Sequence, residues 1–307
     1  MRELSKKIPI LNNNEIFPEN NIFKIVYIDL SHRCNMECAN CYLPNRDFPD
    51  IDTEKLLETI EKFPYRTELR FIGGEPTLHK DLPRIIHKVT NMKFKHRVVL
   101  VTNGLRLSNE NYVKKLVEAG LKTVYLSFNG ADDDSVYQVM DNMKCAKKKM
   151  AAFKNCIKYN IKMALGCIIA KGVNESVLIR IKQILQEHQY YVSLEVRNVG
   201  HIGRYSLSKD ENYSRKELLL LLSNVFEFDI TSDEWKNSII EDDSYSCYFP
   251  IQPDKARLCK TTGIRITDWS KMDQGYSAVD NLKRGRLTQN FSLSPFFEHL
   301  KENENGY

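Results

Sequence analysis

The chain has 307 residues, of which 42% are hydrophobic and 28% charged, as in an ordinary globular protein, and its length suits one large domain with an extension or two modest domains. Its net charge of +5 is too mild to indicate nucleic-acid binding, which goes with a strong and localised basic excess. Residues 1–21 lack the apolar stretch of a secretory signal, and no apolar run is long enough to cross a bilayer, so we expect a cytoplasmic protein without a membrane segment.

Strand-like and helix-like segments alternate after a polar N-terminal extension over residues 1–21. Runs rich in β-branched and apolar residues predict six strands, at 22–31, 67–73, 96–104, 122–130, 161–170 and 191–200. Helical spacing of apolar residues predicts five helices, at 52–63, 79–92, 108–120, 144–159 and 174–188. Asp52 and Ser108 are the expected N-terminal caps of two of them, and Gly120 is an expected C-terminal stop.

This alternation predicts an α/β fold with a parallel sheet and helices outside it. A closed eight-unit barrel takes roughly 250 residues, whereas the pattern stops after six units near residue 200. We therefore expect a partial (β/α)6 TIM-like barrel over residues 22–204, followed by a C-terminal α+β extension over residues 205–307. A doubly wound sheet is the alternative. In either fold the carboxyl ends of the strands carry the active site.

Three of the eight cysteines, Cys34, Cys38 and Cys41, lie within eight residues just after the first predicted strand. In a reducing compartment such a cluster favours metal binding or redox chemistry over disulfides. Three soft thiolates suit a zinc ion or an iron–sulfur cluster. A structural zinc site needs four ligands, for which His32 is a candidate. Three thiolates on a 4Fe–4S cluster would instead leave one iron open to a reactant.

The spacing C-x3-C-x2-C behind the first strand resembles that of the radical S-adenosylmethionine (SAM) enzymes. The second strand ends in a further motif similar to one of that family, Gly73, Gly74, Glu75 and Pro76. Paired glycines let a backbone approach a ligand closely, and proline fixes the turn. The resemblance implies that the Glu75 carboxylate receives the amino group of SAM. It extends over roughly residues 22–204.

The resemblance also implies SAM contacts at the ends of later strands, namely Asn103, Ser127, Asn129 and Arg197. Of these, Ser127 and Asn129 would contact the ribose and the Arg197 guanidinium would pair with the carboxylate of SAM. The family often has an aromatic residue just before the third cysteine, in contact with adenine. Here that position is Asn40, and the aromatic residue, Tyr42, follows the cysteine. We therefore expect an adenine contact at Tyr42, largely through the backbone.

A reaction is implied by the same resemblance. Cys34, Cys38 and Cys41 would hold one 4Fe–4S cluster, whose open iron chelates the amino and carboxylate groups of SAM. An external one-electron reductant, such as flavodoxin or ferredoxin, would supply the electron that breaks the sulfonium C–S bond. The 5′-deoxyadenosyl radical would then abstract hydrogen from the substrate, while the protein orients the reactants and excludes water.

The substrate stays open between a peptide and a small-molecule precursor of a natural product or cofactor. Nucleic acid is the weaker alternative, because the lysine-rich stretch 144–162 has no interleaved aromatic residues for base stacking. A zinc-binding module without enzymatic activity is the contrasting interpretation, but it leaves the glycine–glutamate motif and the strand-end motifs without a purpose. The bond that changes, and whether SAM is consumed or regenerated, are not readable from the sequence.

Two cysteines follow the barrel, Cys247 and Cys259, in a region similar to the SPASM or twitch extension of many radical SAM enzymes. Since an auxiliary cluster usually takes three or four cysteines, we expect a degenerate cap without a second cluster. Either thiol could instead donate a hydrogen atom to a substrate radical. The remaining thiols Cys145, Cys156 and Cys167 are predicted to be core residues, and the lysine-rich stretch 141–172 to be a solvated helix face.

Overall fold

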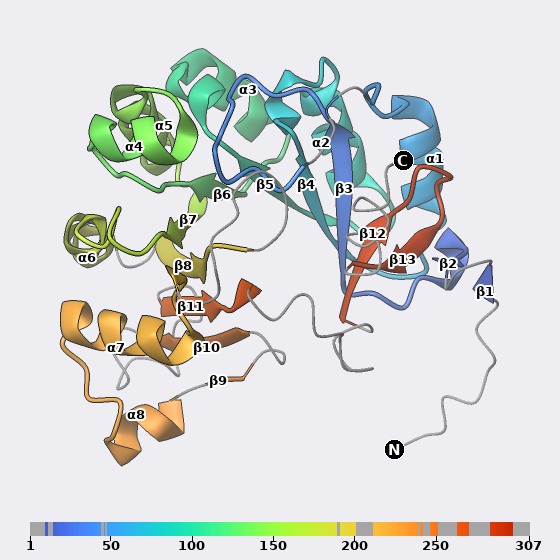
Figure 1. Cartoon of the computed structure of the whole chain (residues 1–307). Helices are drawn as coiled ribbons and strands as arrows, with labels where there is room; N and C mark the ends of the chain where they lie inside the picture. Colours follow the sequence, from blue (N-terminus) through green and yellow to red (C-terminus); the bar gives the residue numbers. More distant parts are fainter. Residues whose placement is uncertain are drawn as a thin grey trace.

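The structure is a computed structural model that describes residues 10–11, 15–43, 46, 48–188, 191–200, 211–238, 240–241, 246–250, 263–269 and 283–296. Six parallel strands form the middle of one sheet: β3 (Ile25–Ser31), β4 (Glu68–Gly73), β5 (Arg97–Thr102), β6 (Thr123–Ser127), β7 (Lys162–Ile169) and β8 (Val192–Asn198). They are neighbours in chain order (Figure 1). The six predicted strands and the parallel α/β arrangement are thereby confirmed.

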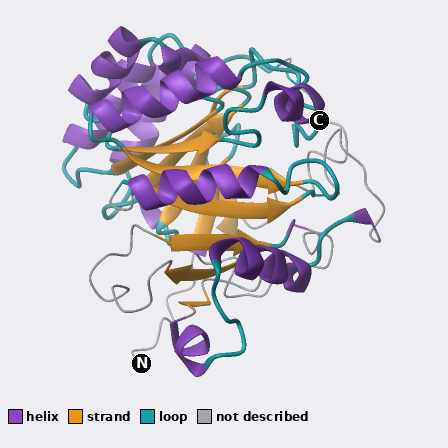
Figure 2. Cartoon of the chain, turned by 90° about the vertical axis from the view of Figure 1, so that its left-hand side faces the viewer, coloured by secondary structure: helices purple, strands orange, loops and turns teal. Residues whose placement is uncertain are grey.

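Helices connect these strands and cover the outside of the sheet (Figure 2). The connecting helices are α1 (Thr53–Glu61), α2 (Leu82–Asn91), α3 (Glu110–Glu118), α4 (Asp134–Asp141), α5 (Ala146–Lys158) and α6 (Val177–Glu187), whereas α7 (Arg215–Phe226) and α8 (Asp233–Ser238) follow β8. Short 3-10 turns occupy Pro18–Asn20, Pro76–Leu78 and Leu105–Ser108. All five predicted helices are present. None of the described helices has the length and apolar character that a membrane crossing requires.

Local chemistry explains where these helices begin and end. The Asp52 carboxylate caps α1 by accepting the backbone N–H of Lys55 at 2.9 Å, as the sequence predicts. The predicted cap at Ser108 is wrong: this residue ends a 3-10 turn, and the side chain of Asn109 caps α3 one residue later. Gly120 follows α3 with φ +106°, a left-handed conformation that favours glycine.

Helix α4 was not predicted from the sequence. Its N-terminus is capped by Asp133, whose carboxylate accepts the backbone N–H groups of Ser135 and Val136. With only eight residues, its buried apolar face of Val136, Tyr137 and Met140 is shorter than the window over which helical periodicity is recognised.

The C-terminal segment adds strands to both edges of the parallel sheet. On one side β11 (Gly263–Thr267) runs parallel to β8 and is followed outward by the antiparallel strands β10 (Ser246–Pro250) and β9 (Ile240–Glu241). On the other side β12 (Arg284–Leu287) runs parallel to β3, and then come β13 (Leu293–Pro295), β2 (Glu15–Ile16) and β1 (Ile10–Leu11). Over the described residues the sheet ends at β1 and β9, so the barrel stays open.

Side chains alternate along the strands between an apolar outer face and a polar inner face. On β3 the residues Val26, Ile28 and Leu30 are fully buried in the core shared with the helices, while Tyr27 and Asp29 on the other face are only partly buried. Strands β4, β8 and β11 repeat this alternation, with Arg70, Glu195 and Arg265 on the inner face. Most barrels fill their interior with branched apolar side chains, so this polar interior indicates a cavity for a ligand.

Candidate active site

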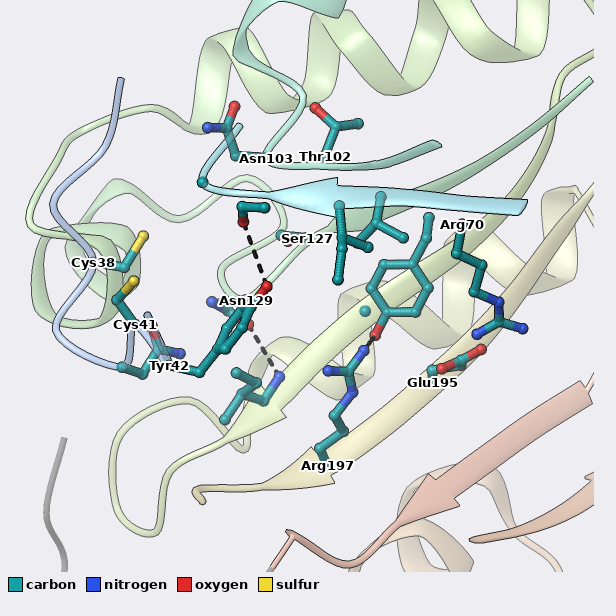
Figure 3. Close-up of a pocket in the computed structure, with 18 of the residues that line it drawn as sticks. Cys38, Cys41, Tyr42, Arg70, Thr102, Asn103, Ser127, Asn129, Glu195 and Arg197 are labelled. Carbon is teal, nitrogen blue, oxygen red and sulfur yellow. Dashed lines mark hydrogen bonds between the residues drawn. The ribbon is translucent and has the colours of Figure 1, made fainter. Parts of the chain in front are cut away.

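A cavity of about 250 Å³ occupies the inside of the open barrel. Its walls come from the cysteine-bearing loop after β3, from the inner faces of β3 to β8, and from β11 and β12. The cysteines lie at one end, and the arginine and glutamate side chains of β4 and β8 lie at the other (Figure 3). The carboxyl ends of the strands thus converge on this cavity, as the sequence predicts.

The loop after β3 is tied to its surroundings by its backbone. The N–H of Ala39 donates to the carbonyl of Met140 at 3.0 Å, and the side-chain amide of Asn142 donates to the carbonyl of Glu37 at 2.7 Å. Both partners belong to the C-terminal end of α4. Helix α4 therefore supports the loop that carries the three cysteines.

All three predicted cysteines line the cavity and are partly exposed. The Cys41 sulfur accepts a hydrogen bond from Arg46 Nη2 at 3.3 Å, and Asn103 Nδ2 lies 3.9 Å from the Cys34 sulfur. Burial raises the pKa of Cys34, and it raises that of Cys38 further, with a contribution from the nearby Asp141. A metal ligand must be a thiolate, and a bound metal cation favours that form.

Three soft thiols on one cavity wall are a donor set that fits an iron–sulfur cluster. Within the part of the chain that the structure describes, no three His, Cys, Asp or Glu side chains stand in an arrangement that could hold one ion. Cys34, Cys38 and Cys41 would hold such a cluster, which would supply redox chemistry at this end of the cavity. His32, the proposed fourth zinc ligand, is not part of the cavity lining, and its ring packs on Phe48 with centroids 4.9 Å apart.

Gly73 and Gly74 allow the cysteine loop to lie against the end of β4. A Cβ atom on Gly73 would stand 2.3 Å from the Ser31 carbonyl oxygen, and one on Gly74 would stand 2.4 Å from the carbonyl oxygens of His32 and Arg33. Two hydrogen bonds close this contact, from Gly74 N–H to Ser31 at 2.7 Å and from Glu75 N–H to Arg33 at 2.8 Å. Both glycines also line the cavity.

Glu75 is fully buried, and its carboxylate is held by protein donors. One oxygen accepts from the backbone N–H and hydroxyl of Thr77 and from the hydroxyl of Thr102, while the other accepts the Asn103 N–H at 2.8 Å. The carboxylate therefore links the turn after β4 to the end of β5 and orients Asn103 toward Cys34. Pro76, also buried, starts the 3-10 turn that follows.

Ser127, the last residue of β6, and Asn129, just after it, both line the cavity. The Asn129 side chain donates to Asp141 at 3.2 Å and accepts the N–H of Ile168 at 3.0 Å, which connects β6 to β7 and to α4. The Ser127 carbonyl accepts a hydrogen bond from Lys149 Nζ at 2.9 Å. Asn129 is thus held in place by protein groups, and the Ser127 side chain faces the cavity (Figure 3).

Lys149 and Asp141 form a buried pair that sequence analysis missed. Lys149 is fully buried and Asp141 nearly so, and Lys149 Nζ lies 3.8 Å from Asp141 Oδ2. The other lysines near it on α5, Lys147 and Lys148, are exposed. The predicted solvated helix face is therefore wrong at Lys149, which points inward from α5 and lines the cavity.

Tyr42 and Arg197 lie on the cavity wall. The Tyr42 hydroxyl is 3.5 Å from the Gly73 carbonyl oxygen, and burial raises the pKa of that hydroxyl. The Arg197 guanidinium lies between two rings, 4.9 Å from the centroid of Tyr125 and 4.8 Å from that of Trp269. It also donates a hydrogen bond to the Tyr125 hydroxyl.

Cys145, Cys156 and Cys167 do not line this cavity. Cys145, Cys156 and Cys167 are buried, which confirms their prediction as core residues, and burial raises the pKa of Cys145 to about 11. Cys247 lies on β10, where its backbone pairs with Ile266 of β11. Cys259 falls outside the described residues. A role for either as a hydrogen donor stays a prediction.

Comparison with known proteins gives a consistent result. Residues 28–185, half of the chain, match the family model of the radical SAM superfamily. The 7,8-dihydro-6-hydroxymethylpterin dimethyltransferase of Methanocaldococcus jannaschii is 35% identical over 157 residues, which cover 48% of this chain and 31% of that protein. The GTP 3′,8-cyclase of Staphylococcus saprophyticus is 24% identical over 251 residues, which cover 77% of this chain and 70% of the cyclase.

The fold is similar to that of Streptococcus suis SuiB, solved in complex with its precursor peptide SuiA. The TM-score is 0.61 at 13% sequence identity, over 91% of this chain and 60% of SuiB. The chain thus spans less than two thirds of both SuiB and the methyltransferase. At this identity the likeness to SuiB concerns the fold, and it supports the partial barrel seen here.

Proposed function

The chain belongs to the radical SAM superfamily, and from that premise we propose that this enzyme binds SAM next to one 4Fe–4S cluster held by Cys34, Cys38 and Cys41. When bound, the cluster supplies the electron that cleaves the sulfonium C–S bond of SAM, so that a 5′-deoxyadenosyl radical can take hydrogen from a substrate. An external one-electron reductant such as flavodoxin or ferredoxin is part of this proposal.

The observation that carries the proposal is the convergence of three thiols on one cavity at the carboxyl ends of the strands. The same cavity is lined by Gly73, Gly74, Asn103, Ser127, Asn129, Arg197 and Tyr42, the residues assigned to SAM. Glu75 and Pro76 are the exceptions: neither lines the cavity, and the Glu75 carboxylate is buried among protein donors behind the wall. We assign it the positioning of Asn103 in addition to any contact with the amino group of SAM.

Two side chains of this chain place hydrogen-bond donors next to the cysteine sulfurs. Arg46 and Asn103 direct N–H groups toward the sulfurs of Cys41 and Cys34, and such donors stabilise thiolates and tune a cluster. Arg46 is itself oriented by the Met36 carbonyl at 2.6 Å and by Glu37 at 2.8 Å. Met36, in the same loop, is buried and packs with Cys34 and Cys38.

For the substrate we propose a peptide or a small-molecule precursor of a natural product or cofactor. The relatives differ in this respect: their names specify a pterin, GTP and a precursor peptide. We propose one cluster without an auxiliary one, since two cysteines after the barrel are too few for a second. Tests of the cluster and of SAM cleavage do not depend on knowing the substrate.

The test compares Cys38→Ala with Cys156→Ala, a thiol buried in the main core away from the cavity. After anaerobic reconstitution, the natural chain and Cys156→Ala are expected to be brown and to bind about four irons, and to form 5′-deoxyadenosine from SAM with dithionite. Cys38→Ala is expected to lose the cluster and the product. Unchanged 5′-deoxyadenosine formation in Cys38→Ala, or a colourless natural chain with one zinc, would refute the proposal.

A further inference from the structure

The end of the cavity away from the cysteines is lined by arginines. We propose that this end binds an oxyanion of the substrate, either a phosphate or a carboxylate, and so orients the substrate relative to the thiols. The inference rests on the proposed function for the identity of the reaction, but the anion site can be measured separately. We refer to Arg70, Arg197, Arg265 and Arg284 as the arginine floor.

The arginine floor comes from four different strands, β4, β8, β11 and β12. Six basic side chains line the cavity against three acidic ones, Asp141, Glu195 and Asp268. Asp141 faces Lys149 and Asp268 accepts a 2.7 Å hydrogen bond from Asn198, so Glu195 is the acidic lining residue set among the floor arginines. Strands do not collect cations at one place for packing, because like charges repel in a low-dielectric interior.

Two ionisable neighbours report the sign of the local potential. Burial alone would raise the pKa of Glu195, yet Arg265, Arg197 and Arg70 lower it overall. Burial would likewise raise the pKa of Tyr27, whereas Arg70, Arg284 and Arg265 lower it. Both groups therefore experience a positive potential strong enough to overcome desolvation, and the same potential favours any anion that enters.

Arg197 is prepared for such an anion. It is held between the rings of Tyr125 and Trp269, and no carboxylate of a described residue lies within salt-bridge distance of it. Stacked guanidinium groups lose little conformational freedom when they bind, and their paired N–H groups match the two oxygens of a carboxylate or phosphate. The floor thus offers rigid donors in addition to charge.

Arg70 contributes from the opposite wall, on β4. Its Nε donates to Glu68 at 2.8 Å and its Nη1 donates to the Tyr27 hydroxyl at 3.0 Å, which fixes the plane of the guanidinium. Glu68 also pairs with Arg97, which lies on β5 outside the cavity and is half exposed. The two arginines therefore share a carboxylate, but only Arg70 is part of the floor. This difference supplies a matched control.

The arginine floor and the thiols lie at opposite ends of the cavity, and for this reason we assign the bound anion to the substrate. Figure 3 shows Cys38 and Cys41 at one end of the cavity and Arg70, Arg197 and Glu195 at the other. Arg197 lies nearest to the middle in that view and could reach a carboxylate of SAM, whereas Arg70 lies beyond it. An oxyanion on Arg70 would leave the rest of the substrate to extend toward the cysteine loop.

The experiment titrates the reconstituted full-length protein, saturated with SAM, with pyrophosphate or citrate at constant ionic strength in a calorimeter. At least one probe is expected to bind saturably, and Arg70→Gln is expected to weaken its binding on the order of tenfold or more, as the loss of one charge-assisted contact implies. Arg97→Gln is expected to bind like the natural chain. Binding of pyrophosphate alone indicates a phosphate on the substrate, and binding of citrate alone indicates a carboxylate.

Three results would overturn the inference: no saturable binding of either probe, equal weakening by Arg97→Gln, or probe binding that occurs only when SAM is left out, which would assign the floor to the cofactor. If Arg70→Gln does not fold, Arg265→Lys serves instead, since it keeps the charge and removes the paired donors. Cluster iron and SAM cleavage without substrate are recorded for the same variants. If the natural chain shows neither cluster iron nor SAM cleavage, the proposed function is refuted. Probe binding that depends on Arg70 would still support the anion site.

Discussion

Gly74 is the point at which the cysteine loop and strand β4 meet. Its missing side chain leaves room for two carbonyl oxygens of the loop, and its N–H binds the Ser31 carbonyl at 2.7 Å. The position of Cys34, three residues after that carbonyl, follows from this contact. The glycine–glutamate motif therefore positions the cysteine loop by backbone packing, in addition to any contact that it makes with a ligand.

Gly74→Ala is expected to displace the cysteine loop, because its Cβ would stand 2.4 Å from the His32 and Arg33 oxygens. We expect a destabilisation of about 1–3 kcal/mol from overpacking and reduced iron after reconstitution. Gly172→Ala is the control: Gly172 has φ +75°, but a Cβ atom there would meet no atom of a non-neighbouring residue within 4 Å, so the substitution introduces backbone strain without a clash. Equal iron content in both variants would contradict the argument.

The cysteines and the glycine–glutamate motif are local in sequence, so their presence in one site could be predicted. The partners of Glu75 could not, since Thr102 and Asn103 lie 27 and 28 residues away and are ordinary residues of a strand end. Arg46 was missed for a similar reason: its contact with the Cys41 sulfur depends on how the loop turns back. Motifs identify ligands more readily than the groups that orient them.

At the scale of elements, α4 and α5 form a support for the cavity. Asp141, at the end of α4, accepts a hydrogen bond from Asn129 in the loop after β6 and faces Lys149 of α5. The strands and the five helices with clear apolar periodicity were predictable, because burial on one side of each element imposes that pattern. Helix α4 and the inward direction of Lys149 were not predictable. A buried lysine looks like any other lysine in a basic stretch of sequence.

Lys149→Met tests this support. Removing the ammonium leaves the nearly buried Asp141 carboxylate without its charge partner, and breaking a buried pair typically costs about 3–5 kcal/mol in the free energy of unfolding. Lys148→Met, on the exposed side of the same helix, should change it by less than about 0.5 kcal/mol. Urea unfolding of both variants gives the comparison. Adding Asp141→Asn to Lys149→Met should recover part of the loss, and a similar small effect of both single substitutions would disprove the pairing.

At the scale of the whole molecule, the C-terminal segment completes both walls of the barrel. Strand β11 extends the sheet beyond β8 and β12 extends it beyond β3, although only residues 268–283 separate these two strands in the chain. The choice of strand partners is set by contacts between distant segments, so it could not be predicted from the pattern of one segment. The division at residue 204 into barrel and cap stays a prediction.

The ion pair of Arg286 with Asp29 fastens β12 to β3 across 257 residues of sequence. Arg286 Nε donates to Asp29 Oδ2 at 2.7 Å, and the Arg286 side chain is fully buried, with its guanidinium 5.8 Å from the ring centroid of Phe296. Because β12 also carries Arg284 of the arginine floor, the pair holds one side of the anion site in place. Its loss should therefore affect the C-terminal strands first.

Arg286→Met is expected to lower the free energy of unfolding by about 3–5 kcal/mol, since it leaves the Asp29 carboxylate, whose side chain is only 10% exposed, without its charge partner. Amide hydrogen exchange should accelerate in β12 and β13 more than in β6 and β7, which lie in the middle of the sheet. Arg180→Met removes a partly exposed ion pair with Asp132 and should cost no more than about 1 kcal/mol. If exchange accelerates equally throughout the sheet in Arg286→Met, the pair stabilises the fold as a whole, and the attachment of β12 must come from its backbone hydrogen bonds to β3.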